Sequence, residues 1–255
     1  KIETQLTWDD LVLNAETRQE IRDLEIWLKH NETLQQKHHT TSRFKQGYRV
    51  LFHGPPGTGK TLTASLLGKY TDREVYRIDL STVVSKYIGE TEKNLAKLFD
   101  KAQYKNWILF FDEADAIFGK RTQVRDAHDK YANQEVSYLL QRLEEHPGLV
   151  ILASNFKNNI DAAFSRRFQA LVYFAPPGYQ ERLELWKKTL PKKFKYAQEI
   201  DLKAIAKTYD ITGAHITNVM HYCCLQALNQ DSLTITSKNL TAGLKREYKK
   251  EEKMF

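Results

Sequence analysis

Residues 54–61 read Gly-Pro-Pro-Gly-Thr-Gly-Lys-Thr, between an apolar run and a helical pattern. Glycines let successive backbone N–H groups point into one concavity, which can cradle the phosphates of a nucleotide. Lys60 can reach the β- and γ-phosphates, and the Thr61 hydroxyl can bind Mg²⁺. The strand before the loop and the helix after it make a chance glycine-rich turn the weaker interpretation. We therefore predict a nucleotide site whose contacts include Pro56, Gly57, Thr58, Gly59, Lys60, Thr61 and Leu62.

Two carboxylates follow the apolar run of residues 107–111. Ligands of open α/β sheets gather at the carboxyl ends of strands, where Asp112 and Glu113 are expected. Asp112 is predicted to help hold hydrated Mg²⁺, through water because that ion keeps several waters. Glu113 is predicted to polarise the attacking water as a general base. The alternative, a carboxylate pair that only caps the next helix, is disfavoured by the position after both the glycine loop and a buried strand.

Asn155 and an arginine pair are further candidates for the same chemistry. Asn155 follows the apolar run 150–153, and its amide can donate to a phosphate and accept from the attacking water. Arg166 and Arg167 carry guanidinium groups, which suit the charge that develops on a transferring phosphoryl group. Spacing alone leaves a surface basic pair as an equally good interpretation of the two arginines.

The elements that would position these residues alternate between strands and helices. Such alternation predicts an α/β fold with a doubly wound, parallel, five-stranded sheet. The expected strands are residues 50–52, 75–79, 107–111, 150–153 and 170–174, and a helix is expected over residues 15–29. Residues 31–47 show no helical periodicity.

The pattern changes at Pro176-Pro177-Gly178, because two prolines halt both a strand and a helix. Beyond this point the apolar spacing is helical, with one short strand possible at residues 233–235. We therefore predict a large α/β ATP-binding domain over residues 1–176 and a small helical lid domain over residues 177–255.

Composition bounds the class of protein. The 255 residues are 41% hydrophobic and 28% charged, as in ordinary globular chains. No apolar run approaches the ~20 residues of a membrane span, and no signal-peptide pattern opens the chain. The low cysteine use fits a reducing cytoplasm, so a cytoplasmic location is expected. The adjacent Cys223 and Cys224 lack the spacing of metal ligands and are interpreted as structural thiols. The net charge of +7 permits acidic partners such as nucleic acid, but the basic residues are scattered.

Taken in order, these motifs resemble the AAA+ ATPases, in particular the AAA clade of katanin, spastin and FtsH. Residues 54–61 match the Walker A motif and residues 108–115 the Walker B motif, while Asn155 falls at the sensor-1 position. Residues 161–168 are similar to the arginine-finger segment. The resemblance implies that Arg166 and Arg167 act in trans on ATP bound by a neighbouring subunit of a ring, expected to be a hexamer.

Three further segments match the clade. Residues 85–92 are similar to the first pore loop, which implies that Lys86, Tyr87 and Ile88 grip an extended polypeptide. Gly213 and Ala214 stand where other AAA+ groups have the sensor-2 arginine, and Asp10 and Leu11 match the segment that lines the adenine pocket. The zinc-protease motif of FtsH is missing from the sequence, so no protease activity of that type is expected. The amino-acid sequence of residues 85–98 and 107–121 is most similar to that of small ATPases of bacterial contractile injection systems.

These residues together predict an enzyme that converts ATP and water to ADP and phosphate with Mg²⁺. The predicted function is that of a homo-oligomeric ring motor that remodels, unfolds or disassembles a protein partner. The alternative is a loader- or helicase-type ATPase that acts on nucleic acid, which only the net charge of +7 favours. A nucleotide-gated scaffold with weak turnover would need a broken catalytic residue, yet Lys60, Glu113 and Asn155 are all present.

Overall fold

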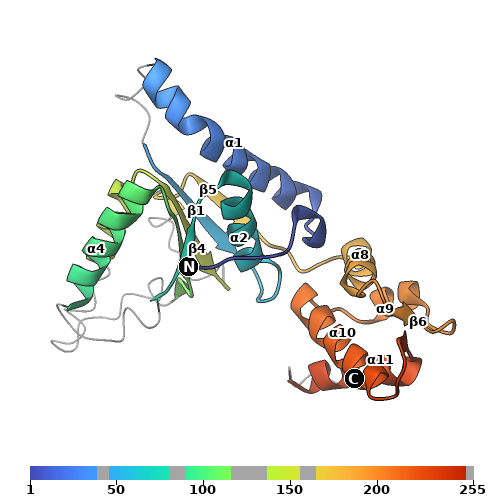
Figure 1. The fold of residues 1–255 in the computed structure, drawn as a ribbon. Helices are drawn as coiled ribbons and strands as arrows, with labels where there is room; N and C mark the ends of the chain where they lie inside the picture. The colour runs from blue at the N-terminus through green and yellow to red at the C-terminus, as the bar shows by residue number, and fades with distance from the viewer. Residues whose placement is uncertain (39–45, 81–89, 116–136, 156–164, 251–255) are drawn as a thin grey trace. The chain divides into compact units, whose positions relative to one another are not determined.

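The computed structural model describes residues 1–38, 46–80, 90–115, 137–155 and 165–250. Five strands form one parallel sheet in the order β2-β3-β4-β1-β5 (Figure 1). Their bounds are Tyr48–His53 for β1, Val75–Asp79 for β2, Ile108–Asp112 for β3, Leu149–Ser154 for β4 and Ala170–Tyr173 for β5. The predicted α/β fold with a five-stranded parallel sheet is confirmed.

Burial follows the position of each strand in the sheet. The central strands β1, β3 and β4 are almost entirely buried, whereas the edge strands β2 and β5 each bury one residue and leave the others partly or fully exposed. The parallel register sets His53 of β1 beside Ser154 of β4. Because all five strands run the same way, the segments that follow β1, β3 and β4 emerge at one edge of the sheet.

Helices cover both faces of this sheet (Figure 1). One face carries α1 (Ala15–His38) and α2 (Lys60–Thr71), and the other carries α4 (Glu90–Lys105) and a helical segment at residues 137–145. On the second face, Phe99 of α4 packs in one buried cluster with Phe111 of β3 and Leu152 of β4. Both faces of the central strands are thus dry, which explains their unbroken apolar runs.

Helix α1 is longer than the sequence pattern indicated. The apolar periodicity stops near Lys29, but the helix continues to His38. The added residues include Glu, Leu, Gln and Lys, which are good helix formers, and contain neither glycine nor proline. Side chains also tether this end, since Asn31 and Gln35 donate to the main-chain oxygen of Gln46 at 3.1 and 3.3 Å.

The C-terminal part of the chain is mostly helical, as predicted. It contains α8 (Tyr179–Thr189), α9 (Leu202–Thr208), α10 (Gly213–Leu228) and α11 (Ser237–Lys250). Two short parallel strands join them, β6 (Lys195–Tyr196) and β7 (Thr234–Ile235). The sequence pattern indicated β7 but not β6, which is too short to show a periodicity. Among the described helices, none combines the length and the apolar character needed to cross a lipid bilayer.

The core of this part is built around fully buried side chains such as Trp186 and Ile216. Cys223 and Cys224 belong to the same core, in which burial raises the pKa of both thiols, that of Cys223 to about 12. Both thiols therefore stay protonated and poorly reactive near neutral pH.

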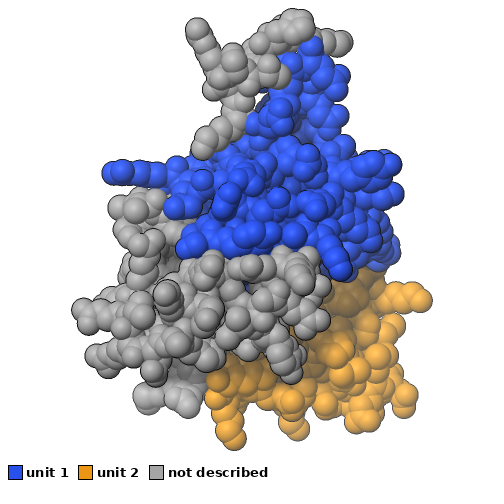
Figure 2. Space-filling model, turned by 90° about the vertical axis from the view of Figure 1, so that its left-hand side faces the viewer, with its two compact units in different colours: residues 1–7, 15–55, 60–174 blue, residues 8–14, 56–59, 175–255 orange. Residues whose placement is uncertain are grey.

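The described chain divides into two compact units (Figure 2). Unit 1 comprises residues 1–7, 15–55 and 60–174, and unit 2 comprises residues 8–14, 56–59 and 175–255. The glycine loop is therefore shared, since its middle residues group with unit 2 and its two ends with unit 1. The division at residue 176 into an ATP-binding domain and a lid domain stays a prediction.

Candidate active site

The loop after β1 depends on glycine at positions where a side chain has no room. Gly54 has a φ of 141°, and a Cβ there would lie 2.2 Å from the main-chain oxygen of Phe174. Gly57 has a φ of 75°, and a Cβ there would lie 2.7 Å from the Ala214 Cβ. Both positions combine a backbone conformation that L-residues rarely adopt with close packing. The resulting bare backbone matches the predicted phosphate cradle.

Lys60, the first residue of α2, turns its amine back toward this loop. The Lys60 Nζ donates to the main-chain oxygens of Gly54 at 2.6 Å and Pro55 at 2.9 Å, and to the Asn155 Oδ1 at 3.1 Å. The residue is only 8% exposed, and burial lowers the pKa of its amine to about 8. The negative charges of Asp112 and Asp115 act in the other direction and raise this pKa, but by less. Among the described residues, the acceptors that hold this ammonium are neutral oxygens. A buried ammonium with such partners would gain from an anion, so Lys60 fits a phosphate ligand.

Asp112 ends β3, and its carboxylate has two partners. The Arg77 Nη2 lies 2.8 Å from the Asp112 Oδ2, and the backbone N–H of Glu113 donates to the Asp112 Oδ1 at 3.0 Å. Thr61 lies in the first turn of α2, directly after Lys60. The Thr61 hydroxyl and the Asp112 carboxylate are hard oxygen donors of the kind Mg²⁺ takes, so they fit this ion. Sequence reasoning missed Arg77, because only the sheet order reveals that β2 lies beside β3.

Glu113 occupies the turn that follows β3. Its side chain is exposed, and its φ is 53°, in the left-handed region that non-glycine residues seldom adopt. Such backbone conformations cost roughly 1 to 3 kcal/mol and cluster at active sites. The strained and accessible Glu113 is therefore compatible with the predicted role of a general base.

Asn155 follows the last residue of β4, and the structure brings it to Lys60. Its side-chain oxygen accepts from the Lys60 amine, whereas its backbone N–H donates to the Asp115 Oδ2 at 3.1 Å. Asn155 and Lys60 are separated by 95 residues, yet β1 and β4 are direct neighbours in the sheet. The structure thus brings the Asn155 amide to the lysine of the glycine loop. Its contacts with a phosphate and with the attacking water stay predictions.

The other predicted nucleotide contacts, Asp10, Leu11, Gly213 and Ala214, lie in unit 2, together with the middle of the loop. The backbone N–H of Ala214 donates to the main-chain oxygen of Gly57 at 3.3 Å, at the start of α10. Leu11 is 8% exposed, and a Cβ at Gly59 would lie 2.8 Å from the Leu11 Cδ1. Asp10 ends the short 3-10 helix Trp8–Asp10, and Gly213 is the first residue of α10. Segments far apart in the sequence thereby meet at the middle of the loop.

The arginine pair lies in a turn at residues 166–167, with both side chains exposed. Arg167 forms an ion pair with Glu144 of the helical segment 137–145. Glu144 gave no signal in the sequence, because nothing there places that segment beside the turn. The predicted pore-loop residues Lys86, Tyr87 and Ile88 lie outside the described residues, as do residues 161–164 of the finger segment.

The remaining predicted loop contacts are accessible to different degrees. Pro56 and Thr61 are exposed, and Thr58 and Leu62 are partly exposed.

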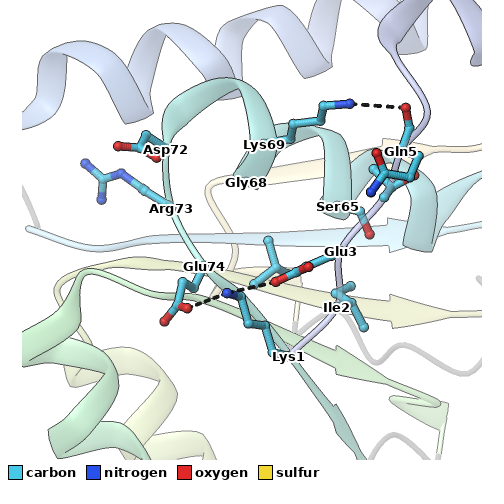
Figure 3. Close-up of a pocket in the computed structure, with 12 residues that line it drawn as sticks. Lys1, Ile2, Glu3, Gln5, Ser65, Gly68, Lys69, Asp72, Arg73 and Glu74 are labelled. Atoms are coloured by element: carbon cyan, nitrogen blue, oxygen red, sulfur yellow. Dashed lines mark hydrogen bonds and ion pairs between the residues drawn. The ribbon is translucent and has the colours of Figure 1, made fainter.

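A separate pocket of about 390 Å³ lies among the N-terminal segment, the end of α2 and the start of β2 (Figure 3). Its three cationic side chains already have partners: Lys1 pairs with Glu3 and Glu74, Lys69 donates to the main-chain oxygens of Gln5 and Leu6, and Arg73 pairs with Glu32. Because these cations are engaged within the chain, we assign this pocket no role.

Comparison with known proteins identifies similar chains. Residues 50–176 match the family described as "ATPase family associated with various cellular activities (AAA)". The chain is 34% identical to the proteasome-activating nucleotidase of Aeropyrum pernix over 77% of this chain and 50% of that protein. It is 30% identical to the cell division cycle protein 48 homolog of Archaeoglobus fulgidus, over 88% of this chain and 31% of that protein. It is also 30% identical to the ATPase family gene 2 protein of Schizosaccharomyces pombe, over 88% of this chain and 27% of that protein.

The chain thus spans half or less of the length of these three relatives. The narrower resemblance to ATPases of contractile injection systems has no support in these comparisons.

The lowered pKa of Lys60 predicts a pH dependence of stability. Between about pH 8 and pH 10.5 the unfolded chain keeps this proton while the folded chain loses it. The free energy of unfolding should therefore rise with pH through this window, relative to a Lys60→Met variant that lacks the group. Urea midpoints of both proteins at pH 7.5 and pH 9.5 measure the effect. A difference between the two proteins that is flat or falls with pH would contradict the burial of a charged amine.

Proposed function

Because the chain belongs to the AAA family of ATPases, we propose that it hydrolyses ATP with Mg²⁺ in a ring of identical subunits that remodels a protein partner. The observation that carries the proposal is the convergence of Lys60 and Asn155 at the glycine loop, beside the carboxylates that end β3. The chain spans only part of its relatives, so the activity, the substrate and the partners of the whole protein belong to this proposal.

Nucleotide binding falls to the loop and to Lys60. The backbone N–H groups of the loop and the positive end of α2 favour binding of the phosphates. The Lys60 amine, which now donates to neutral carbonyl and amide oxygens, would donate to charged phosphate oxygens instead. Thr61 and Asp112 would hold Mg²⁺, which when bound neutralises part of the phosphate charge. Asp10 and Leu11 would line the adenine pocket, and Gly213 and Ala214, at the start of α10, would also contact the nucleotide.

Hydrolysis then requires an aligned and activated water molecule. Glu113 is the carboxylate proposed to accept the proton of that water, which ends on the carboxylate oxygen. As the water oxygen forms its bond to the γ-phosphorus, the bond from that phosphorus to the bridging oxygen breaks, and this oxygen leaves with ADP. The Asn155 amide can accept from that water and donate to the phosphate, so it fixes the line of attack. The Lys60 ammonium stabilises the charge that develops on the transferring group.

Assembly into a ring is proposed from the arginine pair. Both guanidinium groups are exposed, and Arg167 is held by Glu144, so a neighbouring copy of the chain could reach them. Exposed ion pairs are weak, with typical energies of about 0.2 to 1 kcal/mol, so the contact with Glu144 would not prevent a trans role.

A protein partner is favoured over nucleic acid. The relative from Aeropyrum pernix is named as an activator of the proteasome. The segment of residues 86–88 is one lysine, one tyrosine and one isoleucine, which suits apolar contacts with a polypeptide. A nucleic-acid backbone would require several cationic contacts there. The loader or helicase alternative therefore rests on the net charge of +7 alone.

Glu113→Gln should abolish hydrolysis while it preserves ATP binding, because the amide keeps the shape of the side chain but cannot accept the proton. We expect a fall in kcat of about 10² to 10⁴-fold, the usual contribution of general acid–base catalysis. Phosphate release measures turnover, and a fluorescent nucleotide measures binding. Glu199→Gln, which changes an exposed turn, serves as the matched control. Turnover by Glu113→Gln close to that of the unaltered protein would reject Glu113 as the base.

Mixing two inactive variants tests the ring. Arg167→Ala and Lys60→Ala should each be inactive alone, yet a mixed ring contains interfaces in which an intact finger meets an intact glycine loop. A finger supplied in trans contributes about 10³ to 10⁵ in rate, so even a small rescued fraction is measurable. Lys60→Ala mixed with Glu113→Gln is the control, because each copy then has a defective site of its own. Absence of rescue in rings shown to be mixed would remove Arg167 from the trans role.

Tyr87→Ala tests the class of partner. An unfolded polypeptide should stimulate the ATPase of the unaltered protein, and the ratio of stimulated to basal rates should fall to about one in the variant, since the aromatic contact surface is lost. Tyr104→Ala removes another tyrosine, one that is 85% exposed on α4, and should keep the stimulation. Strong stimulation by DNA with a steep salt dependence, insensitive to Tyr87→Ala, would instead favour the nucleic-acid alternative.

A further inference from the structure

Asp115 lies three residues beyond the end of β3, and its carboxylate spans the end of β4. The Ser154 Oγ donates to the Asp115 Oδ1 at 2.5 Å, and the backbone N–H of Asn155 donates to the Asp115 Oδ2 at 3.1 Å. Ser154 is 1% exposed, so this contact is shielded from water. Hydrogen bonds to a carboxylate are stronger than neutral ones, and both oxygens are used.

The same strand end holds two other parts of the site. The backbone N–H of Gly54 donates to the main-chain oxygen of Ser154 at 3.2 Å, which ties the start of the glycine loop to β4. The backbone N–H of Ala114 donates to the main-chain oxygen of Ala153 at 2.9 Å, which ties the segment after β3 to β4. Asp115 therefore binds the end of β4 at the point where the glycine loop, the acidic segment and Asn155 meet.

The position of the Asn155 side-chain amide depends on how firmly the Asn155 backbone is held. The Asn155 Oδ1 accepts from the Lys60 amine at 3.1 Å, while its backbone N–H is held by Asp115. Loss of the second contact would free the backbone of Asn155, which follows the last strand residue. Misplacement of a reacting group by about 1 Å can cost roughly 10²-fold in rate.

We propose that Asp115 is a positioning residue that acts through Asn155, which it fixes by hydrogen bonds to Ser154 and to the Asn155 backbone. The inference rests on the proposed ATPase function. Asp115 would act on the end of β4 rather than on the nucleotide itself. The expected consequence is a defect in kcat without a matching defect in nucleotide affinity.

A rival explanation is purely electrostatic. The negative charge of Asp115 opposes the lowering of the pKa of Lys60, so Asp115 could act on that amine through space. The two explanations differ for Asp115→Asn. An asparagine can accept from the Asn155 N–H through its oxygen and donate to the Ser154 hydroxyl through its nitrogen, because a hydroxyl both donates and accepts. Positioning would survive this change, whereas the charge would be lost.

The experiment compares Asp115→Ala, Asp115→Asn, Asn155→Ala and the double variant Asp115→Ala/Asn155→Ala in the full chain. ATP turnover gives kcat, and a fluorescent ADP analogue gives the dissociation constant. We expect kcat to fall about 10- to 100-fold in Asp115→Ala, as for a displaced catalytic group, and only a few-fold in Asp115→Asn. Nucleotide affinity should stay within about threefold in both variants, because Asp115 is expected to act on the end of β4 and not on the nucleotide.

The double variant decides whether Asp115 acts through Asn155. Residues that act as a unit are non-additive, so the double variant should be no slower than Asn155→Ala. An independent readout is the backbone amide resonance of Asn155 without nucleotide, which should move in Asp115→Ala as its acceptor is lost. If Asp115→Ala is recovered only as aggregate, Asp115→Ser, with one oxygen in place of two, takes its place in every comparison.

Several results would overturn the inference. They are an unchanged kcat in Asp115→Ala, equal losses in Asp115→Asn and Asp115→Ala, or full additivity with Asn155→Ala. These outcomes leave the proposed function intact, because the unaltered protein still hydrolyses ATP and Glu113→Gln does not. If the unaltered protein fails to hydrolyse ATP under any condition, the proposed function fails and the role of Asp115 falls with it.

Discussion

A single buried cation is the constraint on which the site depends. The Lys60 amine is almost inaccessible to water and is held by two loop carbonyls and the side-chain oxygen of Asn155. Burying an ammonium without a counter-charge is costly, and the lowered pKa of Lys60 expresses that cost. The two nearby carboxylates only partly offset it. Such a site favours a polyanion, because a bound phosphate would offset the free-energy cost of burying the Lys60 ammonium.

The parallel sheet makes this arrangement possible. Neighbouring strands deliver the glycine loop, the acidic segment and Asn155 to one edge, although they are tens of residues apart in the chain. The strands β1, β3 and β4 that carry these segments are buried between helices on both faces of the sheet. Short contacts at the strand ends, such as that of Asp115 with Ser154, then set the position of the polar groups. The chemistry therefore depends on sheet order as much as on residue type.

The glycine loop is also shared between the two compact units. Its ends belong to the unit of the sheet, and its middle residues belong with the C-terminal helices. Within unit 2, the Ala214 N–H and the crowded space at Gly57 link the loop to the first turn of α10. Within unit 1, Gly54 is packed against the backbone of Phe174, directly after β5. The conformation of the loop is thus set by separate contacts in each unit, and glycine is required for both.

The sequence by itself determined the fold class, the five strands, and the glycine loop with its lysine, because these depend on local patterns and on the fixed spacing of a motif. It also placed Asp112, Glu113 and Asn155 at strand ends. Only the tertiary structure decided which side chains meet: Arg77 with Asp112, Asp115 with Ser154 and Asn155, and Glu144 with Arg167. These pairs join separate segments, so no periodicity signals them. The extra turns of α1 and the short β6 were likewise missed. The end of α1 carries no apolar repeat and is tethered by side chains, and β6 is too short to show a periodicity.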